Sequence, residues 1–106
     1  MRFIQRKSNA HEINNTSQDV LICPADRKVR VLSLYIYNPN NTLSSTKVEI
    51  EKNSLNPITF FDYSIPSGDS HSLFSDNIYL EPGDKIIVST TGIVHTVISY
   101  KEIKAI

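Results

Sequence analysis

The chain has 106 residues and a mass of 12.0 kDa, which is enough for one domain with one hydrophobic core. Eleven basic and eleven acidic side chains give a formal net charge of zero, so the basic excess of a dedicated nucleic-acid-binding protein is absent. A single cysteine excludes an internal disulfide and any multi-cysteine zinc site. No stretch approaches the ~20 apolar residues of a membrane helix, and no apolar run follows the basic N-terminus as in a secretory signal. We therefore expect one soluble domain, residues 1–106, made without export.

The composition favours strands over helices. Val, Ile and Thr account for 28 residues and Ala for three, a bias toward side chains that suit a pleated sheet. Turn-forming groups of Pro, Gly, Asn and Asp interrupt the chain every ~8 to 15 residues. In chain order, the pattern predicts strands at 12–14, 18–23, 28–38, 47–52, 57–64, 71–74, 77–80, 84–90 and 93–103.

These eight or nine strands predict an all-β protein, a single antiparallel β-sandwich of the jelly-roll or immunoglobulin-like kind. Segment 47–52 alternates apolar and charged residues, as a half-buried strand does. Glu81-Pro82-Gly83-Asp84 is typical of a type II turn between two strands. The expected core consists of Val48, Ile50, Ile58, Phe60, Ile86, Val88 and Val97, with Leu34 and Ile36 as further candidates.

The sequence offers little for catalysis. Ser67, Asp69 and His71 are the residue types of a hydrolase triad, but neighbours within one loop seldom converge as a triad must, so we interpret them as a polar turn. Cys23 has no local histidine to activate it and is expected to be a buried structural residue. The remaining histidines, His11 and His95, show no metal-ligand spacing with His71. We expect no enzyme, no cofactor and no metal site.

Several segments resemble small β-sandwich virion proteins encoded beside the capsid and connector genes of tailed bacteriophages. The resemblance covers roughly residues 29–103 and is most specific in the LEPGD turn and the closing SYKEI strand. The segments that carry it are 32–38 (LSLYIYN), 46–51 (TKVEIE), 58–63 (ITFFDY), 65–68 (IPSG), 78–84 (IYLEPGD), 86–90 (IIVST) and 97–103 (VISYKEI).

The resemblance implies a non-enzymatic structural protein of the virion, serving as a capsid decoration, head–tail connector or tail accessory subunit. It implies synthesis in the bacterial host cytoplasm and location in the particle. Its partners would be other virion proteins of the capsid, neck or tail and further copies of itself, with no specific nucleic acid and no membrane. The alternative is a carbohydrate- or receptor-binding sandwich, for which Tyr35, Tyr37, Phe61 and Tyr63 would supply a stacking platform.

Charge is unevenly distributed along the neutral chain. Residues 53–84 hold five acids and no Lys or Arg, whereas basic and apolar residues share the N-terminus. We predict that residues 1–7 form an arm that contacts a neighbouring copy or another virion protein, the alternative being a frayed terminus. The acidic region from Asp62 to Asp84 is one candidate receiving surface. The candidate interface residues are Arg2, Phe3, Ile4, Arg6, Lys7, Asp62, Asp69 and Asp76.

Overall fold

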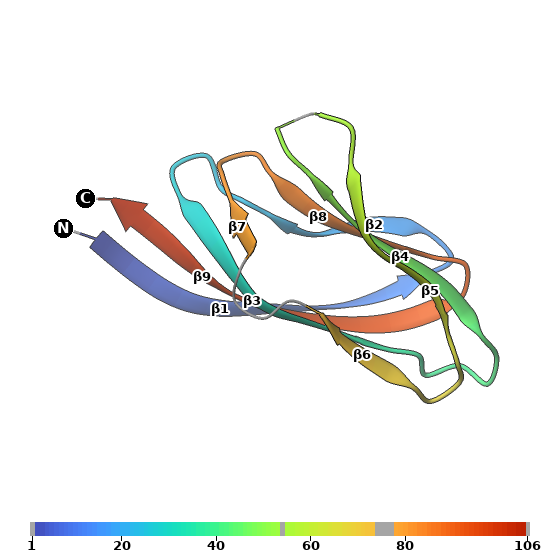
Figure 1. Cartoon of the computed structure of the whole chain (residues 1–106). Coiled ribbons are helices and arrows are strands. Elements are labelled where there is room, and N and C mark those ends of the chain that lie inside the picture. The colour runs from blue at the N-terminus through green and yellow to red at the C-terminus, as the bar shows by residue number, and fades with distance from the viewer. Residues whose placement is uncertain (1, 54, 74–77, 106) are drawn as a thin grey trace.

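The computed structural model describes residues 2–53, 55–73 and 78–105, and nine strands make up most of this part of the chain (Figure 1). Every predicted strand has a counterpart, so the all-β prediction is confirmed. The strands are β1 (Arg2–Asn14), β2 (Ser17–Ile22), β3 (Lys28–Tyr37), β4 (Ser44–Glu51), β5 (Ile58–Ile65), β6 (Ser70–Leu73), β7 (Ile78–Leu80), β8 (Lys85–Thr90) and β9 (Ile93–Ala105).

The strands form two antiparallel sheets that lie as two layers (Figure 1). The first sheet has the order β1-β9-β3-β6, with β7 also paired to β3, and the second has the order β2-β8-β4-β5. Strands β6 and β7 pair with opposite halves of β3, so they occupy one strand position. Counted in this way, eight strands pair first with last, second with next to last, and so on inwards. This nested pairing is a jelly roll and excludes the immunoglobulin-like alternative.

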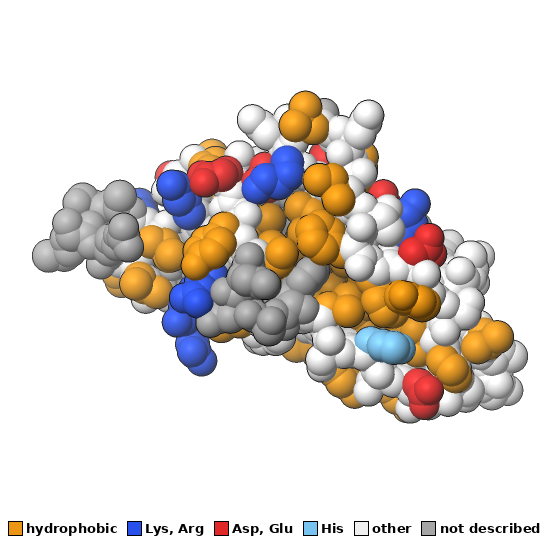
Figure 2. Space-filling model, viewed as in Figure 1, with side chains coloured by type: hydrophobic (Ala, Val, Ile, Leu, Met, Phe, Trp, Pro, Cys, Tyr) orange, Lys and Arg blue, Asp and Glu red, His pale blue; other side chains and the backbone are white. Residues whose placement is uncertain are grey.

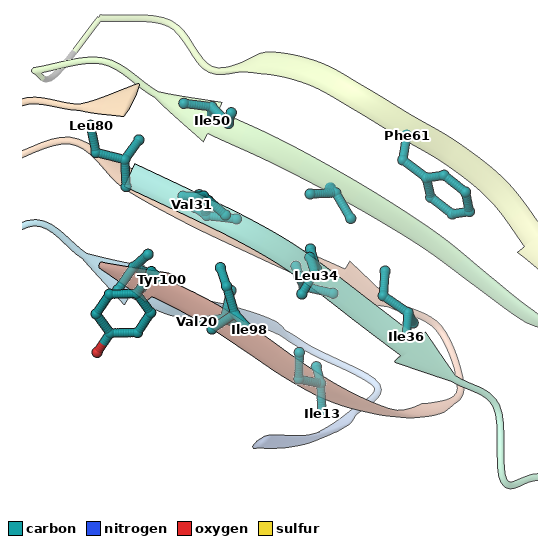
Figure 3. Packing of buried hydrophobic residues seen from close by; sticks show 14 of the residues in the cluster. Ile13, Val20, Val31, Leu34, Ile36, Ile50, Phe61, Leu80, Ile98 and Tyr100 are labelled. Carbon is teal, nitrogen blue, oxygen red and sulfur yellow. The ribbon is translucent and has the colours of Figure 1, made fainter. Parts of the chain in front are cut away.

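The hydrophobic core lies between the two layers (Figure 3). Alternate residues of the central strands point inward, as the period of a β-strand requires. Six of the expected core residues are buried as predicted: Leu34, Ile36, Val48, Ile50, Ile86 and Val88.

The assignment of three residues to the core is wrong. Phe60 is 47% exposed because a bulge in β5 inserts it between Thr59 and Phe61, and Phe61 takes the buried place opposite Val48. Ile58 faces inward beside Ile50 but stands on the edge strand β5, where it is 56% exposed.

Val97 is the third wrong assignment, and it is 40% exposed. It is followed directly by Ile98 in a segment without strict alternation, so the sequence leaves its face undecided. Pairing with Tyr35 turns it to the outside of the first sheet, while Thr96 and Ile98 take the inner positions.

The turn between β7 and β8 is confirmed. The Asp84 N–H donates to the Glu81 carbonyl at 3.0 Å, and Gly83 has φ +89°, the left-handed value that a type II turn needs at its third residue. The Asp84 carboxylate accepts a hydrogen bond from the Glu81 N–H at 2.9 Å. The turn is therefore closed by both the backbone and the side chain of Asp84.

Candidate assembly surface

The two chain ends form a paired ribbon that projects from one end of the sandwich (Figure 1). Arg2 pairs with Ala105 and the pairing continues without interruption to Asn14. Residues 2–7 are thus part of the edge strand β1, neither a free arm nor a frayed end. Phe3 and Ile4 are 53% and 56% exposed on this ribbon. Contact of these residues with a neighbouring copy stays a prediction.

Glu102 joins the ribbon to the body of the protein. Its buried carboxylate accepts hydrogen bonds from Lys7, with Nζ at 2.9 Å, and from the Arg27 guanidinium on the loop between β2 and β3. Burial raises the pKa of Glu102, but these two hydrogen bonds outweigh it and hold the pKa below its usual value. Lys7 therefore has a structural contact inside the molecule.

Arg6 points away from this ion-pair cluster. Arg6 is exposed and pairs in register with Lys101, so both residues lie on the outer face of the first sheet. Arg2 lies in β1 opposite Ala105. The basic N-terminus is therefore divided between an inner structural residue, Lys7, and an outer residue, Arg6.

The acidic segment 53–84 does not form one surface. Asp62 is exposed on the outer face of the second sheet, opposite Lys47. Asp69 is exposed in the turn between β5 and β6, at the end of the molecule away from the chain termini (Figure 1). Asp76 lies outside the described residues.

The last two acids of the segment lie near the ribbon and have basic partners. Glu81 lies 3.7 Å from the Lys28 ammonium. Asp84 is buried and paired with Lys52. Burial raises the pKa of Asp84, but the Lys52 hydrogen bond and the turn N–H lower it further than burial raises it. The predicted receiving surface is therefore reduced to separate positions, of which Asp62 and Asp69 face solvent.

The Ser67–His71 segment forms a turn and the beginning of β6. Ser67 Oγ donates to the Asn40 carbonyl at 2.6 Å, and the His71 ring packs edge-on against Phe61 at 5.2 Å between centroids. Ser67 and His71 therefore contact different neighbours, which is not the convergence that a hydrolase triad needs. Among the described residues, no cluster of three His, Cys, Asp or Glu side chains could hold a metal ion.

The four aromatic residues of the carbohydrate-binding alternative do not share a platform. Tyr35 faces outward on the first sheet and is 42% exposed, whereas Phe61 is buried between the layers. Tyr63 is exposed and packs edge-on against Phe61 at 5.0 Å. Hydrophobic side chains do gather over β5 and β6 (Figure 2), but Tyr35 and Tyr37 belong to the opposite side of the first sheet.

Cys23 is buried at the end of β2, as expected. Its thiol lies within hydrogen-bond reach of the Arg27 carbonyl at 3.2 Å and the Leu80 carbonyl at 3.5 Å. Burial, followed by the charges of Asp84 and Glu81, raises the pKa of the thiol to about 11. The thiolate is therefore disfavoured, as befits a structural residue.

A groove of about 660 Å³ lies at the ribbon end of the molecule. Its walls come from the β2–β3 loop, β7, the turn that follows β7, and β9. The lining is mostly apolar and includes Ala25, Tyr79, Leu80, Pro82 and Ile103. The groove therefore adds apolar surface next to the projecting ribbon.

Comparison with known proteins finds the same fold in solved structures. No family model and no curated protein sequence matches the chain. A chain from Bacillus endospore appendages, described as a novel family of disulfide-linked pili, aligns with TM-score 0.61 and 8% identity over 100% of this chain and 91% of its own. A chain from the acidic stable capsid of Helicobacter pylori bacteriophage KHP30 aligns with TM-score 0.60 and 9% identity over 96% and 93%. At these identities the likeness is one of fold.

The described residues contain no helix long and apolar enough to cross a membrane.

Proposed function

We propose that this chain is a structural protein of a tailed-bacteriophage virion, which acts through protein–protein contacts and without catalysis. The observation that carries the proposal is the match of nearly the whole chain, over nearly the whole of its counterpart, to a subunit of a phage capsid. The sequence resemblance over residues 29–103 points to the same class. Within the particle, the chain would serve as a capsid decoration, connector or tail accessory subunit that assembles with itself and with other virion proteins.

The surface of the chain supports an assembling role. Phe3 and Ile4 are more than half exposed on a ribbon that projects beyond the sandwich, where a neighbour could cover them. A glycan-binding module has less support, because its aromatic residues lie on different faces and the chain contains no Trp.

The test is particle association. Antibodies raised against the purified protein would be used to probe gradient-purified phage particles from the source culture, by immunoblot and by immunogold electron microscopy. We expect the protein to band with the particles and the gold to label a fixed position on head, neck or tail. Label on surface filaments in place of particles would favour a pilus-type subunit, and protein found only in the soluble fraction would refute the proposal.

A further inference from the structure

A row of three cations crosses the outer face of the first sheet. Arg6 on β1 pairs with Lys101 on β9, and Lys101 pairs with Arg30 on β3. Neighbouring strands are ~4.8 Å apart, so the row spans about 10 Å. The next residue in the row is Tyr79, whose ring centroid lies 5.8 Å from the Arg30 guanidinium. Like charges directly opposite one another destabilise a sheet, so the Arg6–Lys101 pair carries a folding cost and attracts anions.

Exposed apolar side chains accompany this row. Ile4 and Tyr79 are 56% and 58% exposed, and Ile103, opposite Ile4, is partly exposed. Lys and Arg side chains project from the lower layer in the half of the molecule near the termini (Figure 2). We name this surface the basic face, and it consists of Ile4, Arg6, Arg30, Tyr79, Lys101 and Ile103.

The outer face of the second sheet has the opposite balance. Its outward strand positions hold two cations, Lys47 and Lys85, against four acids, an excess of two negative charges. Ile22 is 55% exposed there and Ile87 is partly exposed. Lys85 lies 3.5 Å from both Asp19 and Glu51, and Lys47 lies 3.7 Å from Glu49, so these two cations offset part of the negative charge. We name this surface the acidic face, and it consists of Asp19, Ile22, Lys47, Glu49, Glu51, Asp62, Lys85 and Ile87.

We infer that the basic face of one copy stacks on the acidic face of the next. Each face joins apolar side chains to charges of one prevailing sign, and the two signs are complementary. Because the faces lie on opposite layers of the same molecule, the contact is head to tail and can repeat into a ring or an open filament. A polyanion would fit the basic face alone and would leave the acidic face without a role. This inference rests on the proposed structural function and names the surface through which copies associate.

The test uses charge reversal on each face of the full-length protein. One variant combines Arg6→Glu with Lys101→Glu, and the other combines Glu49→Lys with Glu51→Lys. Lys104→Gln is the control, because Lys104 pairs in register with Phe3 and lies outside both faces, and the neutral Gln gives up its exposed ion pair with Asp26 without adding a like charge there. Circular dichroism would establish that every variant keeps the β spectrum, and light scattering coupled to size-exclusion chromatography would give the assembly mass at low and high salt.

We expect the wild type and the control to form multiples of the 12.0 kDa chain at low salt and to dissociate near 1 M salt, where the Debye length falls to about 3 Å. Each reversal variant should associate about 10- to 100-fold more weakly on its own. An equimolar mixture of the two should recover the assembly, because one variant then presents acids on both faces and the other presents bases on both.

Three results would overturn the stacking contact. These are reversal variants that assemble like the wild type, a mixture that stays monomeric, and a wild type that is monomeric at low salt but binds heparin through Arg6 and Lys101. The last result would identify a polyanion as the partner. Particle association of both reversal variants at the wild-type level would reject stacking while leaving the proposed virion role intact, whereas absence of the wild type from particles would reject that role itself.

Discussion

The inner face of β9 changes character along its length. In the middle of the sandwich it presents Val94 and Ile98, both fully buried between the layers. Toward the chain ends the same face presents Glu102, held by Lys7 and Arg27. One strand therefore joins a part stabilised by hydrophobic burial to a part stabilised by ion pairs.

The stability of the apolar middle and the stability of the ion-paired end should therefore depend on different solution conditions. Hydrophobic burial depends little on pH or salt, whereas paired charges depend on protonation and on screening. The ribbon of chain ends can therefore be loosened by acid or by mutation while the middle of the sandwich stays folded. Such independence suits a segment whose position could be adjusted by contact with a neighbour.

The largest expected effect concerns the apolar region. Phe61→Ala should cost about 3 to 5 kcal/mol of unfolding free energy, because it removes a ring that is 5% exposed. Phe60→Ala is the matched control and should cost less than about 1 kcal/mol, because that ring stands out on a bulge and is 47% exposed. Chemical denaturation of both variants measures the two losses. Equal losses would show that the bulge is misplaced.

The next effect concerns the charged region. Glu102→Gln should cost about 1 to 3 kcal/mol, because Lys7 and Arg27 lose their shared carboxylate. Glu12→Gln, whose side chain is 60% exposed at the other end of β1, should be nearly neutral. Hydrogen exchange of the ribbon amides, together with chemical denaturation, would localise the loss. If hydrogen exchange became faster throughout the sandwich and not mainly in the ribbon, the proposed independence of the two regions would be contradicted.

Acid should reproduce part of that loss. The pKa of Glu102 in the folded protein is below the 4.5 of the unfolded chain, and the pKa of Asp84 is likewise lowered. Their stabilisation is present above pH 4.5 and is lost as the pH falls through the lowered folded-state values. Denaturation midpoints measured from pH about 6 to about 3 should therefore fall less steeply in Glu102→Gln than in the wild type. Parallel pH profiles of the two proteins would show that protonation of Glu102 is not responsible for the loss of stability in acid.

The smallest effect is a change in rate at Cys23, whose thiol lies against the Arg27 carbonyl near the boundary of the two regions. A buried thiol with a pKa of about 11 should react slowly with a disulfide reagent in the native protein. Glu102→Gln removes one of the ion pairs that hold Arg27 and should speed the reaction, whereas Phe60→Ala should not. An unchanged rate in Glu102→Gln would show that the ion pairs of Glu102 do not control access to the Cys23 thiol.

The sequence was sufficient to place most strands because their patterns are local. Segment 47–52 alternates, and the turn at Pro82 and Gly83 carries its own backbone requirements. Strand β1 was expected only at 12–14, because its inner positions Lys7, Asn9 and His11 are polar and conceal the alternation. Its partner is β9, far away in sequence. Only that long-range pairing reveals the full strand.

The parts of the site that the sequence missed also depend on partners distant in the chain. The acids of segment 53–84 suggested one surface, but the fold places Asp62 on the outer face of the second sheet, Asp69 in the β5–β6 turn, and Glu81 and Asp84 in the β7–β8 turn. Nothing near Glu102 in sequence indicates that it would be buried with Lys7 and Arg27. The cation row is likewise invisible in the chain order, since Arg6, Arg30 and Lys101 meet only when β1, β9 and β3 align.

The nested strand pairing has a consequence for the order of synthesis and folding. Because β1 pairs with β9 up to Arg2 and Ala105, β1 leaves the ribosome well before the strand that completes it and must wait for that strand. Until then β1 exposes its backbone groups on both edges, and its charged residues Arg6 and Lys7 help to keep it from pairing with other nascent chains. The β4–β5 hairpin, whose strands are close in sequence, can form early. Closure of the ribbon is thus the natural final step, and truncation of the C-terminal strand would leave β1 permanently without its partner.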